Sequence, residues 1–207
     1  MSEEIVVPYL HYEDLRETAD DFLAEFHSSR ELPIPIEEIV EFQLGMNIFP
    51  LPGIKDLLDI DGFISSDLRV ITVDEYIYTR FENRYRFTLA HEIGHFWMHK
   101  EVFEKADINS IEGWKEFVTA IPEKQHNALE YQANCFAGLV LVPQESLVEV
   151  VNSKVKLLDE NDISLKENWG IAWEYICTDV ARTFSVSKDV VERRVNFDKV
   201  KVRYGDK

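Results

Sequence analysis

The sequence has few cysteines, a deficit of basic residues and no long apolar run. Its two cysteines, Cys135 and Cys177, are too few for a disulfide framework in a chain of 207 residues. Arginine and lysine total 22 against 39 acidic residues, and the net charge of -17 argues against general affinity for nucleic acid, because that affinity comes from neutralising phosphates. No stretch has the pattern of a signal peptide or a membrane span. We therefore expect a cytoplasmic protein that binds neither a membrane nor, directly, nucleic acid.

The sequence does contain enough apolar material for a core. Hydrophobic residues make up 45% of the chain, which suits one domain or one domain with a small appendage. The segment 158–168 is polar and loop-like, so it is the best internal boundary. We expect a main domain over residues 1–157 and a helical extension over residues 158–207 that packs on it.

Histidine and glutamate recur at a metal-binding spacing in residues 86–95, which read Arg-Phe-Thr-Leu-Ala-His-Glu-Ile-Gly-His. Apolar residues at three- and four-residue offsets predict a buried helix here. On a helix, His91 and His95 stand on one face, one turn or about 6 Å apart, so both imidazoles can bind one metal ion. Glu92 lies one step further round, where a base must sit to take a proton from water at the metal. Because such short motifs also arise by chance in charged helices, the flanking sequence has to decide between the two interpretations.

A catalytic zinc needs three protein ligands and one open position, so a third ligand is required. Residues 128–137, leading into 138–143, predict a second buried helix, in which Glu130 and Asn134 share one stripe. Glu130 would supply the third ligand, and Asn134 could hydrogen-bond the outer nitrogen of a ligating histidine and fix its tautomer. Other residues stay open as ligands without a supporting pattern: His126, Glu123 and Glu104.

Two other arrangements fit the sequence less well. His99 follows His95 by one turn but lies two turns from His91, so we expect it to end the helix rather than to bind the same ion. The longer metzincin pattern requires glycine and histidine further along the helix, where this sequence has Met98 and Glu101.

These motifs resemble the ImmA/IrrE family of zinc-dependent metallopeptidases. The likeness lies in the residues 86–95 quoted above, in the later Glu-Tyr-Gln-Ala-Asn-Cys-Phe-Ala and in Leu-Val-Pro, and it extends over residues 15–196. It implies one Zn²⁺ per chain, held by His91, His95 and Glu130, with Glu92 as the catalytic base. It also implies a partner, because members cleave or otherwise inactivate helix-turn-helix repressors of the Xre type, often encoded beside them. The stretch between the two motifs, residues 100–125, is longer than usual for the family. The resemblance therefore implies the metal ligands but not the shape of the substrate cleft.

Strand signals cluster before the motif helix. Asn47-Ile-Phe predicts a short strand, and residues 61–74 predict an antiparallel hairpin with its turn near Ser66 and Asp67. In zinc peptidases with this motif, the strand before the motif helix commonly borders the cleft, where an extended substrate can pair with a free edge. An ordinary sheet strand without a ligand is the alternative. We expect the substrate edge to comprise Arg69, Val70, Ile71, Thr72 and Val73.

Helices account for most of the remaining chain. Apolar periodicity predicts them over residues 12–26, 36–44, 144–156, 171–184 and 188–196. Residues 76–86, by contrast, read as a charged, aromatic connector. The sequence therefore predicts an α+β fold, with a predominantly helical, zincin-like core, a small antiparallel sheet and a C-terminal helical hairpin.

The turn between the last two helices resembles that of a helix-turn-helix. Its DNA-reading residues would be Lys188, Arg193 and Arg194, but Asp189 and Glu192 interrupt this basic face. We therefore expect a structural hairpin packed on the core.

Two functions from different classes follow. The first is a zinc endopeptidase that cleaves a repressor and so relieves transcriptional repression. The second is a non-proteolytic regulator or toxin–antitoxin component that binds a repressor or DNA, with a structural or vestigial metal site. A vestigial site would tolerate loss of Glu92, because that residue is not needed to hold a metal, so its presence favours the endopeptidase.

Overall fold

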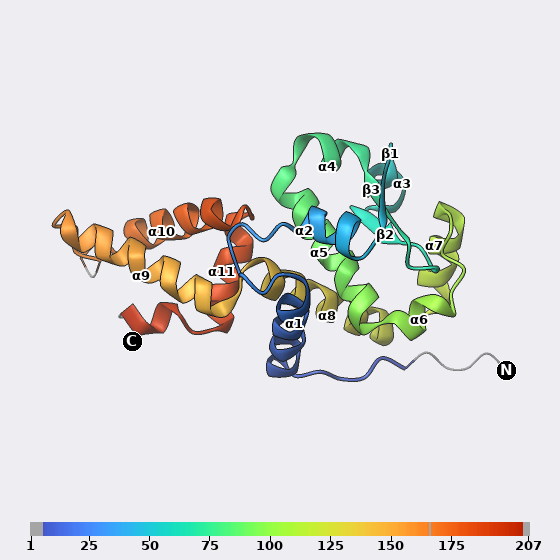
Figure 1. Ribbon diagram of the computed structural model, residues 1–207, viewed down its shortest axis with the longest axis horizontal. Coiled ribbons are helices and arrows are strands. Elements are labelled where there is room, and N and C mark those ends of the chain that lie inside the picture. The colour runs from blue at the N-terminus through green and yellow to red at the C-terminus, as the bar shows by residue number, and fades with distance from the viewer. Residues whose placement is uncertain (1–5, 166, 205–207) are drawn as a thin grey trace.

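The computed structural model describes residues 6–165 and 167–204, which form many helices and one small sheet (Figure 1). The first half contains α1 (Tyr12–Phe26), α2 (Ile36–Glu38), the π-helical turn η1 (Ile39–Gln43), β1 (Asn47–Leu51), α3 (Ile54–Leu58), β2 (Gly62–Ile64), β3 (Val70–Asp74), α4 (Glu75–Arg80) and α5 (Glu82–Met98). The second half contains α6 (Lys100–Glu104), α7 (Ile111–Ala120), α8 (Glu123–Leu141), α9 (Gln144–Glu160), α10 (Trp169–Phe184), α11 (Lys188–Phe197) and the 3-10 turn η2 (Lys201–Tyr204). The predominantly helical α+β class is thereby confirmed.

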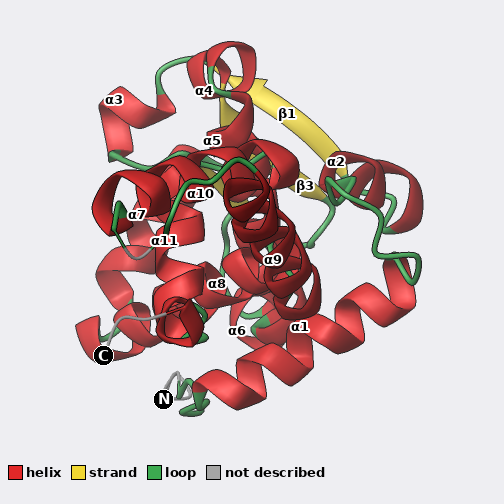
Figure 2. Cartoon of the chain, turned by 90° about the vertical axis from the view of Figure 1, so that its left-hand side faces the viewer, coloured by secondary structure: helices red, strands yellow, loops and turns green. Residues whose placement is uncertain are grey.

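The sheet has the strand order β1-β3-β2 and lies toward the top of both views, with α1 and α8 below it (Figures 1 and 2). β2 and β3 form the predicted antiparallel hairpin, with Gly62 opposite Val73. β1 runs parallel to β3, with Asn47 opposite Val70, so the sheet is mixed rather than purely antiparallel.

The prediction that residues 69–73 form a free substrate edge is wrong. β3 is the central strand and pairs on both sides, so it has no free edge for a substrate. The sequence predicted the β2–β3 pair and the short strand at Asn47, but not that this strand pairs with the other side of β3. Buried side chains on both faces of β3, including Ile71, Thr72 and Val73, are typical of such a central position.

The expected connector over residues 76–86 is helical instead. The side chain of Asp74 accepts hydrogen bonds from the backbone N–H groups of Tyr76 and Ile77, at 3.0 and 3.2 Å, and so starts α4 directly after β3. α5 then begins at Glu82, well before the motif. The strand end and the motif helix are thus joined by a capped helix rather than by a loop.

The core is organised around the crossing of α5 and α8. Gly94 of α5 faces Ala133 and Phe136 of α8, and a Cβ atom at Gly94 would lie 3.1 Å from the Ala133 Cα and 3.2 Å from the Phe136 Cδ1. The absence of a side chain at Gly94 therefore allows the two helices to approach this closely. α1 covers α8 from below, where Phe22 makes edge contacts with Phe136 at a ring separation of 5.5 Å.

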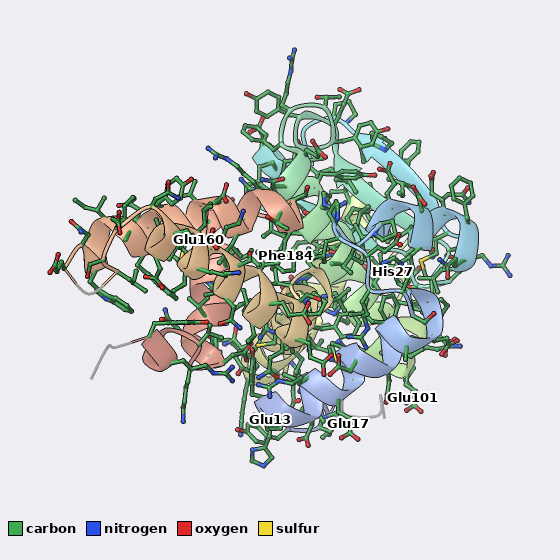
Figure 3. All side chains as sticks on the ribbon, turned by 60° about the vertical axis from the view of Figure 1, so that its left-hand side comes forward. Glu13, Glu17, His27, Glu101, Glu160 and Phe184 are labelled. Atoms are coloured by element: carbon green, nitrogen blue, oxygen red, sulfur yellow. The ribbon has the colours of Figure 1, made fainter. Side chains whose placement is uncertain are left out.

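The last three helices form a lobe attached to this core. α9 and α10 lie side by side, and α11 returns to α8 (Figure 1). Phe184, fully buried at the end of α10, lies where this lobe meets the rest of the molecule (Figure 3). At the junction between this lobe and the core, Arg86 of α5 donates a hydrogen bond to the Ser185 carbonyl at 3.1 Å. α9 continues through the expected boundary at residue 157, and the division into residues 1–157 and 158–207 stays a proposal.

The buried Arg194 holds α11 in place and is not available to DNA. Its guanidinium donates two hydrogen bonds to the Val142 carbonyl, at 3.1 and 3.0 Å, and pairs with Asp198 at 2.9 Å. Lys188 is occupied by ion pairs with Glu174 and Glu192. This arrangement agrees with the expectation of a packed hairpin. Acidic residues of α1, such as Glu13 and Glu17, project outward (Figure 3).

Within the described residues, no single helix has the length and apolar composition that would let it cross a membrane. α8 and α9, which meet at a bend of 54°, pass that test only as a pair.

The crossing predicts different outcomes for two helical glycines. A methyl group at Gly94 collides with α8, whereas one at Gly138 meets only the Arg194 Cδ at 3.5 Å, an ordinary contact. Overpacking costs about 1–3 kcal/mol, while alanine is favoured over glycine in a helix by up to about 1 kcal/mol. We expect Gly94→Ala to lower the free energy of unfolding, measured in urea, relative to Gly138→Ala by about 1–3 kcal/mol. Equal stability of the two variants would show that the crossing is not tight.

Candidate metal centre

The structure brings His91, His95 and Glu130 together. The histidines extend one turn apart from α5, and Glu130 faces them from α8. The Nε2 atoms of His91 and His95 are 3.1 Å apart. The carboxylate of Glu130 places one oxygen 3.4 Å from His91 Nε2 and the other 3.5 Å from His95 Nε2. Each residue thus turns a ligand atom toward one common point.

These separations fit a tetrahedral metal ion. Zinc binds histidine nitrogen at about 2.0–2.1 Å and carboxylate oxygen at about 2.0–2.2 Å, so two ligand atoms on one ion lie about 3.3 Å apart. The nitrogen–nitrogen separation of 3.1 Å lies close to that value, as do the nitrogen–oxygen separations of 3.4 and 3.5 Å, which involve different oxygens of Glu130. Two imidazoles and one carboxylate are also a donor set that catalytic zinc sites use. His91, His95 and Glu130 can therefore hold zinc without rearranging the backbone.

The surroundings shift the pKa values of the three side chains in different directions. Burial opposes ionisation of Glu130, but the adjacent imidazoles of His91 and His95 outweigh that effect and hold its pKa well below the usual range. Burial likewise opposes protonation of His91, but Glu130 and Glu92 outweigh it and raise its pKa. Burial dominates at His95 and lowers its pKa to about 3. Glu130 is therefore an anionic ligand and His95 a neutral one, as metal binding requires.

Glu92 is a buried carboxylate directly beside these residues. Its side chain is on the β2 side of α5, where the backbone N–H of Ile64 contacts it. Only 4% of the residue is exposed, and this burial raises the pKa of Glu92 to about 7 in spite of the nearby His91. A carboxylate with a pKa near neutrality can both accept and return a proton, as a general base must.

A cleft of about 340 Å³ opens over the four residues. β2 forms one wall through Gly62 and Phe63, and α7 forms another through Trp114 and Phe117. α7 belongs to the segment between the two motifs, so that segment shapes the cleft. A second hollow of about 870 Å³, which reaches α11, shares Asp61, Arg84, Phe87 and Asn134 with the first.

The other suggested ligands do not join the group of donor atoms. Glu104 and Glu123 are exposed, and neither belongs to a metal-binding cluster among the described residues. His126 comes closer, because its Nε2 lies 3.9 Å from a Glu130 oxygen and its ring lines the cleft. His126 is thus a neighbour of the site rather than a member of the donor set.

The two histidine ligands have different polar neighbours. Asn134 donates its side-chain N–H to the Glu130 carbonyl at 2.8 Å and lies beside His91, where its amide contributes to the raised pKa. His99 instead contacts His95, with the two Nδ1 atoms 3.1 Å apart. His99 does end α5, as expected, but only 3% of it is exposed. The four-residue spacing between His95 and His99, which places both on one face of a helix, is the sequence signal that could have indicated this contact.

Comparison with known proteins agrees with this geometry. A family model described as Peptidase_M78, IrrE N-terminal-like domain, matches residues 43–196, which is most of the chain. A solved Mycobacterium tuberculosis transcriptional regulator has a similar fold, with a TM-score of 0.55 and 15% sequence identity over 88% of this chain. The chain spans 46% of the length of that regulator, so the likeness concerns the fold alone. Among curated proteins, none matches the sequence.

The buried Glu92 predicts that its replacement by a neutral residue makes the protein more stable, by an amount that depends on pH. Because the folded-state pKa is raised above the usual 4.5 to about 7, the contribution of Glu92 to stability is full below pH 4.5 and is lost as pH rises through 7. We expect Glu92→Gln to raise the free energy of unfolding of the zinc-free protein by about 2–3 kcal/mol at pH 8 and by much less at pH 5. Urea unfolding at both pH values tests this, with the exposed Glu116→Gln as control. A gain that is equal at both pH values would contradict a raised pKa.

Proposed function

This chain belongs to the Peptidase_M78 family of IrrE N-terminal-like domains, and on that premise we propose that it is a zinc-dependent endopeptidase. The observation that carries the proposal is the meeting of two imidazole nitrogens, 3.1 Å apart, with the Glu130 carboxylate, whose two oxygens lie 3.4 and 3.5 Å from them, beside the buried Glu92 in a cleft. A metal site needed only for structure would have no use for Glu92.

The roles of the residues follow from their positions. His91, His95 and Glu130 would hold the zinc ion, which when bound makes a water molecule more acidic and polarises the substrate carbonyl. Glu92 takes one proton from the attacking water as the new bond to the carbonyl carbon forms. It then delivers that proton to the peptide nitrogen as the carbon–nitrogen bond breaks, so the products are a carboxylic acid and an amine, which exchange one further proton to become a carboxylate and an ammonium group. Asn134, one helical turn after Glu130, would orient His91.

β2 replaces β3 as the candidate substrate edge. Asp61 accepts a hydrogen bond from the Asp74 N–H, and the Ser65 N–H donates to Val70, so the odd-numbered residues of this segment face β3. The backbone groups of Gly62 then point to the other side, because neighbouring residues of a strand alternate, while the N–H of Ile64 on that side contacts Glu92. That side borders the cleft above Glu92. An extended substrate segment can pair with it through main-chain hydrogen bonds.

We propose that the substrate is a helix-turn-helix repressor of the Xre type, encoded nearby. Cleavage would take place in the cytoplasm. The support is the resemblance to ImmA/IrrE proteins, together with the net charge of -17, which suits a basic DNA-binding partner. Cleavage of the repressor would relieve transcriptional repression. A non-proteolytic regulator that only binds the repressor is the alternative, and the second experiment below separates the two.

Purified protein is expected to hold about one zinc ion per chain. His95→Ala removes one of three ligands and should lose the metal, whereas His27→Ala, at the far end of α1, should retain it (Figure 3). Elemental analysis after dialysis measures both. A wild-type protein without metal would reject the zinc site.

Glu92→Gln is expected to keep zinc but to lose cleavage of the partner repressor by at least about 100-fold, because it removes the general base and spares the ligands. Gel analysis of the repressor incubated with each variant measures the cleavage, with Glu116→Gln as the matched control. If Glu92→Gln relieves repression as fully as the wild type, the protein acts by binding alone.

A further inference from the structure

A chain of hydrogen bonds runs from the outer nitrogen of His95 to the N-terminal segment. His95 Nδ1 lies 3.1 Å from His99 Nδ1, and His99 Nε2 lies 2.8 Å from Gln132 Oε1. Gln132 in turn donates its Nε2–H to the Pro8 carbonyl at 2.7 Å. The three side chains are 3%, 3% and 2% exposed, so water does not compete for these bonds.

The chain has one direction, which its last member sets. A backbone carbonyl can only accept a hydrogen bond, so Gln132 must turn its NH₂ group to Pro8 and its oxygen to His99. An amide oxygen also only accepts, so His99 Nε2 carries the proton there. The Nδ1 atom of a neutral His99 is then an acceptor, and His95 must donate to it from Nδ1. His95 Nε2 is left with a free lone pair.

That lone pair points where a metal would be bound. His95 Nε2 faces His91 Nε2 at 3.1 Å and a Glu130 oxygen at 3.5 Å, as described above. A histidine binds a metal only through an unprotonated nitrogen, so the opposite tautomer of His95 would block the site. We propose that His99 and Gln132 are positioning residues that keep His95 in its metal-binding tautomer, in a direction set by the Pro8 carbonyl.

The N-terminal segment is held at two points of α8. The Val7 N–H donates to Gln125 Oε1 at 2.7 Å, two helical turns before the bond between Pro8 and Gln132. Only the second bond belongs to the chain that leads to His95. Gln125 therefore offers a matched control: it holds the same segment, from the same helix, without touching His99.

The first test reads the tautomer directly in zinc-free protein. Nitrogen-15 chemical shifts of the histidine rings distinguish a proton on Nδ1 from one on Nε2. We expect His95 to carry its proton on Nδ1 in the wild type and in Gln125→Leu. In His99→Phe, which keeps an aromatic ring but no acceptor, we expect a mixture of both tautomers. A wild-type His95 protonated on Nε2 would overturn the proposal.

The second test measures zinc affinity by competition with a chromophoric chelator. His99→Phe is expected to bind zinc about 10–100-fold more weakly, which is the usual effect of losing such a partner. His99→Gln should stay within a few-fold of the wild type, because its amide oxygen can accept the Nδ1 proton. Adding Gln132→Leu to His99→Phe should weaken binding no further, since Gln132 acts through His99. Wild-type affinity in His99→Phe would overturn the proposal.

The folding of each variant and the binding of zinc by the wild type are measured separately. Thermal unfolding of the zinc-free variants shows whether each is folded. If His99→Phe does not fold, Gln132→Leu is tested in its place. Only the affinity part rests on the proposed zinc site. If the wild type binds no zinc, the proposed function fails, while the nitrogen-15 shifts still decide whether the hydrogen-bond chain sets the tautomer of His95.

Discussion

The close contact between α5 and α8 at Gly94 is the constraint on which the rest of the structure depends. Ligand atoms on two helices can share one ion only if the backbones approach closely, because histidine and glutamate side chains are short compared with the usual interaxial distance of about 8–10 Å. A Cβ atom at Gly94 would lie only 3.1 Å from the Ala133 Cα, so a larger residue would require the two helices to move apart by a few tenths of an ångström. The same contact places Gln132 beside His99, so both the ligands of the candidate metal centre and the residues behind them are fixed by one packing interaction.

Around this crossing, the protein buries polar groups that a simple core would exclude. Glu92, His95, His99 and Gln132 are each less than 5% exposed. Burial without partners would cost several kcal/mol for a charged group, and hydrogen bonds offset that cost for most of these side chains. Glu92 is the exception, since its raised pKa shows that its charged form is poorly compensated. Such a group is costly to stability and useful for proton transfer, which is typical of a catalytic carboxylate.

The elements with strong helical periodicity were predictable from the sequence, and the contacts between elements were not. α1 begins and ends at the predicted residues, and the helices that carry His91, His95 and Glu130 lie where their apolar patterns indicate. The position of β3 depends on a third strand that pairs through backbone groups, about which side-chain patterns say nothing. The contact between His99 and His95 did not follow from the sequence, because a four-residue spacing places two side chains on one face of a helix without showing that they meet. The Asp74 cap, which converts a presumed connector to α4, is a single side chain that a charged, aromatic sequence conceals.

The free side of β2 has a consequence for which proteins can be cut. Pairing with a strand edge requires the substrate backbone to be fully extended, and a helix-turn-helix domain is made almost wholly of helices, whose backbone groups already bond to each other. A peptide bond inside such a helix becomes accessible only when that part of the repressor opens locally. The rate of cutting would then follow the population of the opened form, so a more stable repressor would resist for longer. Selectivity in such a pair would reside as much in the folding equilibrium of the target as in the shape of the cleft.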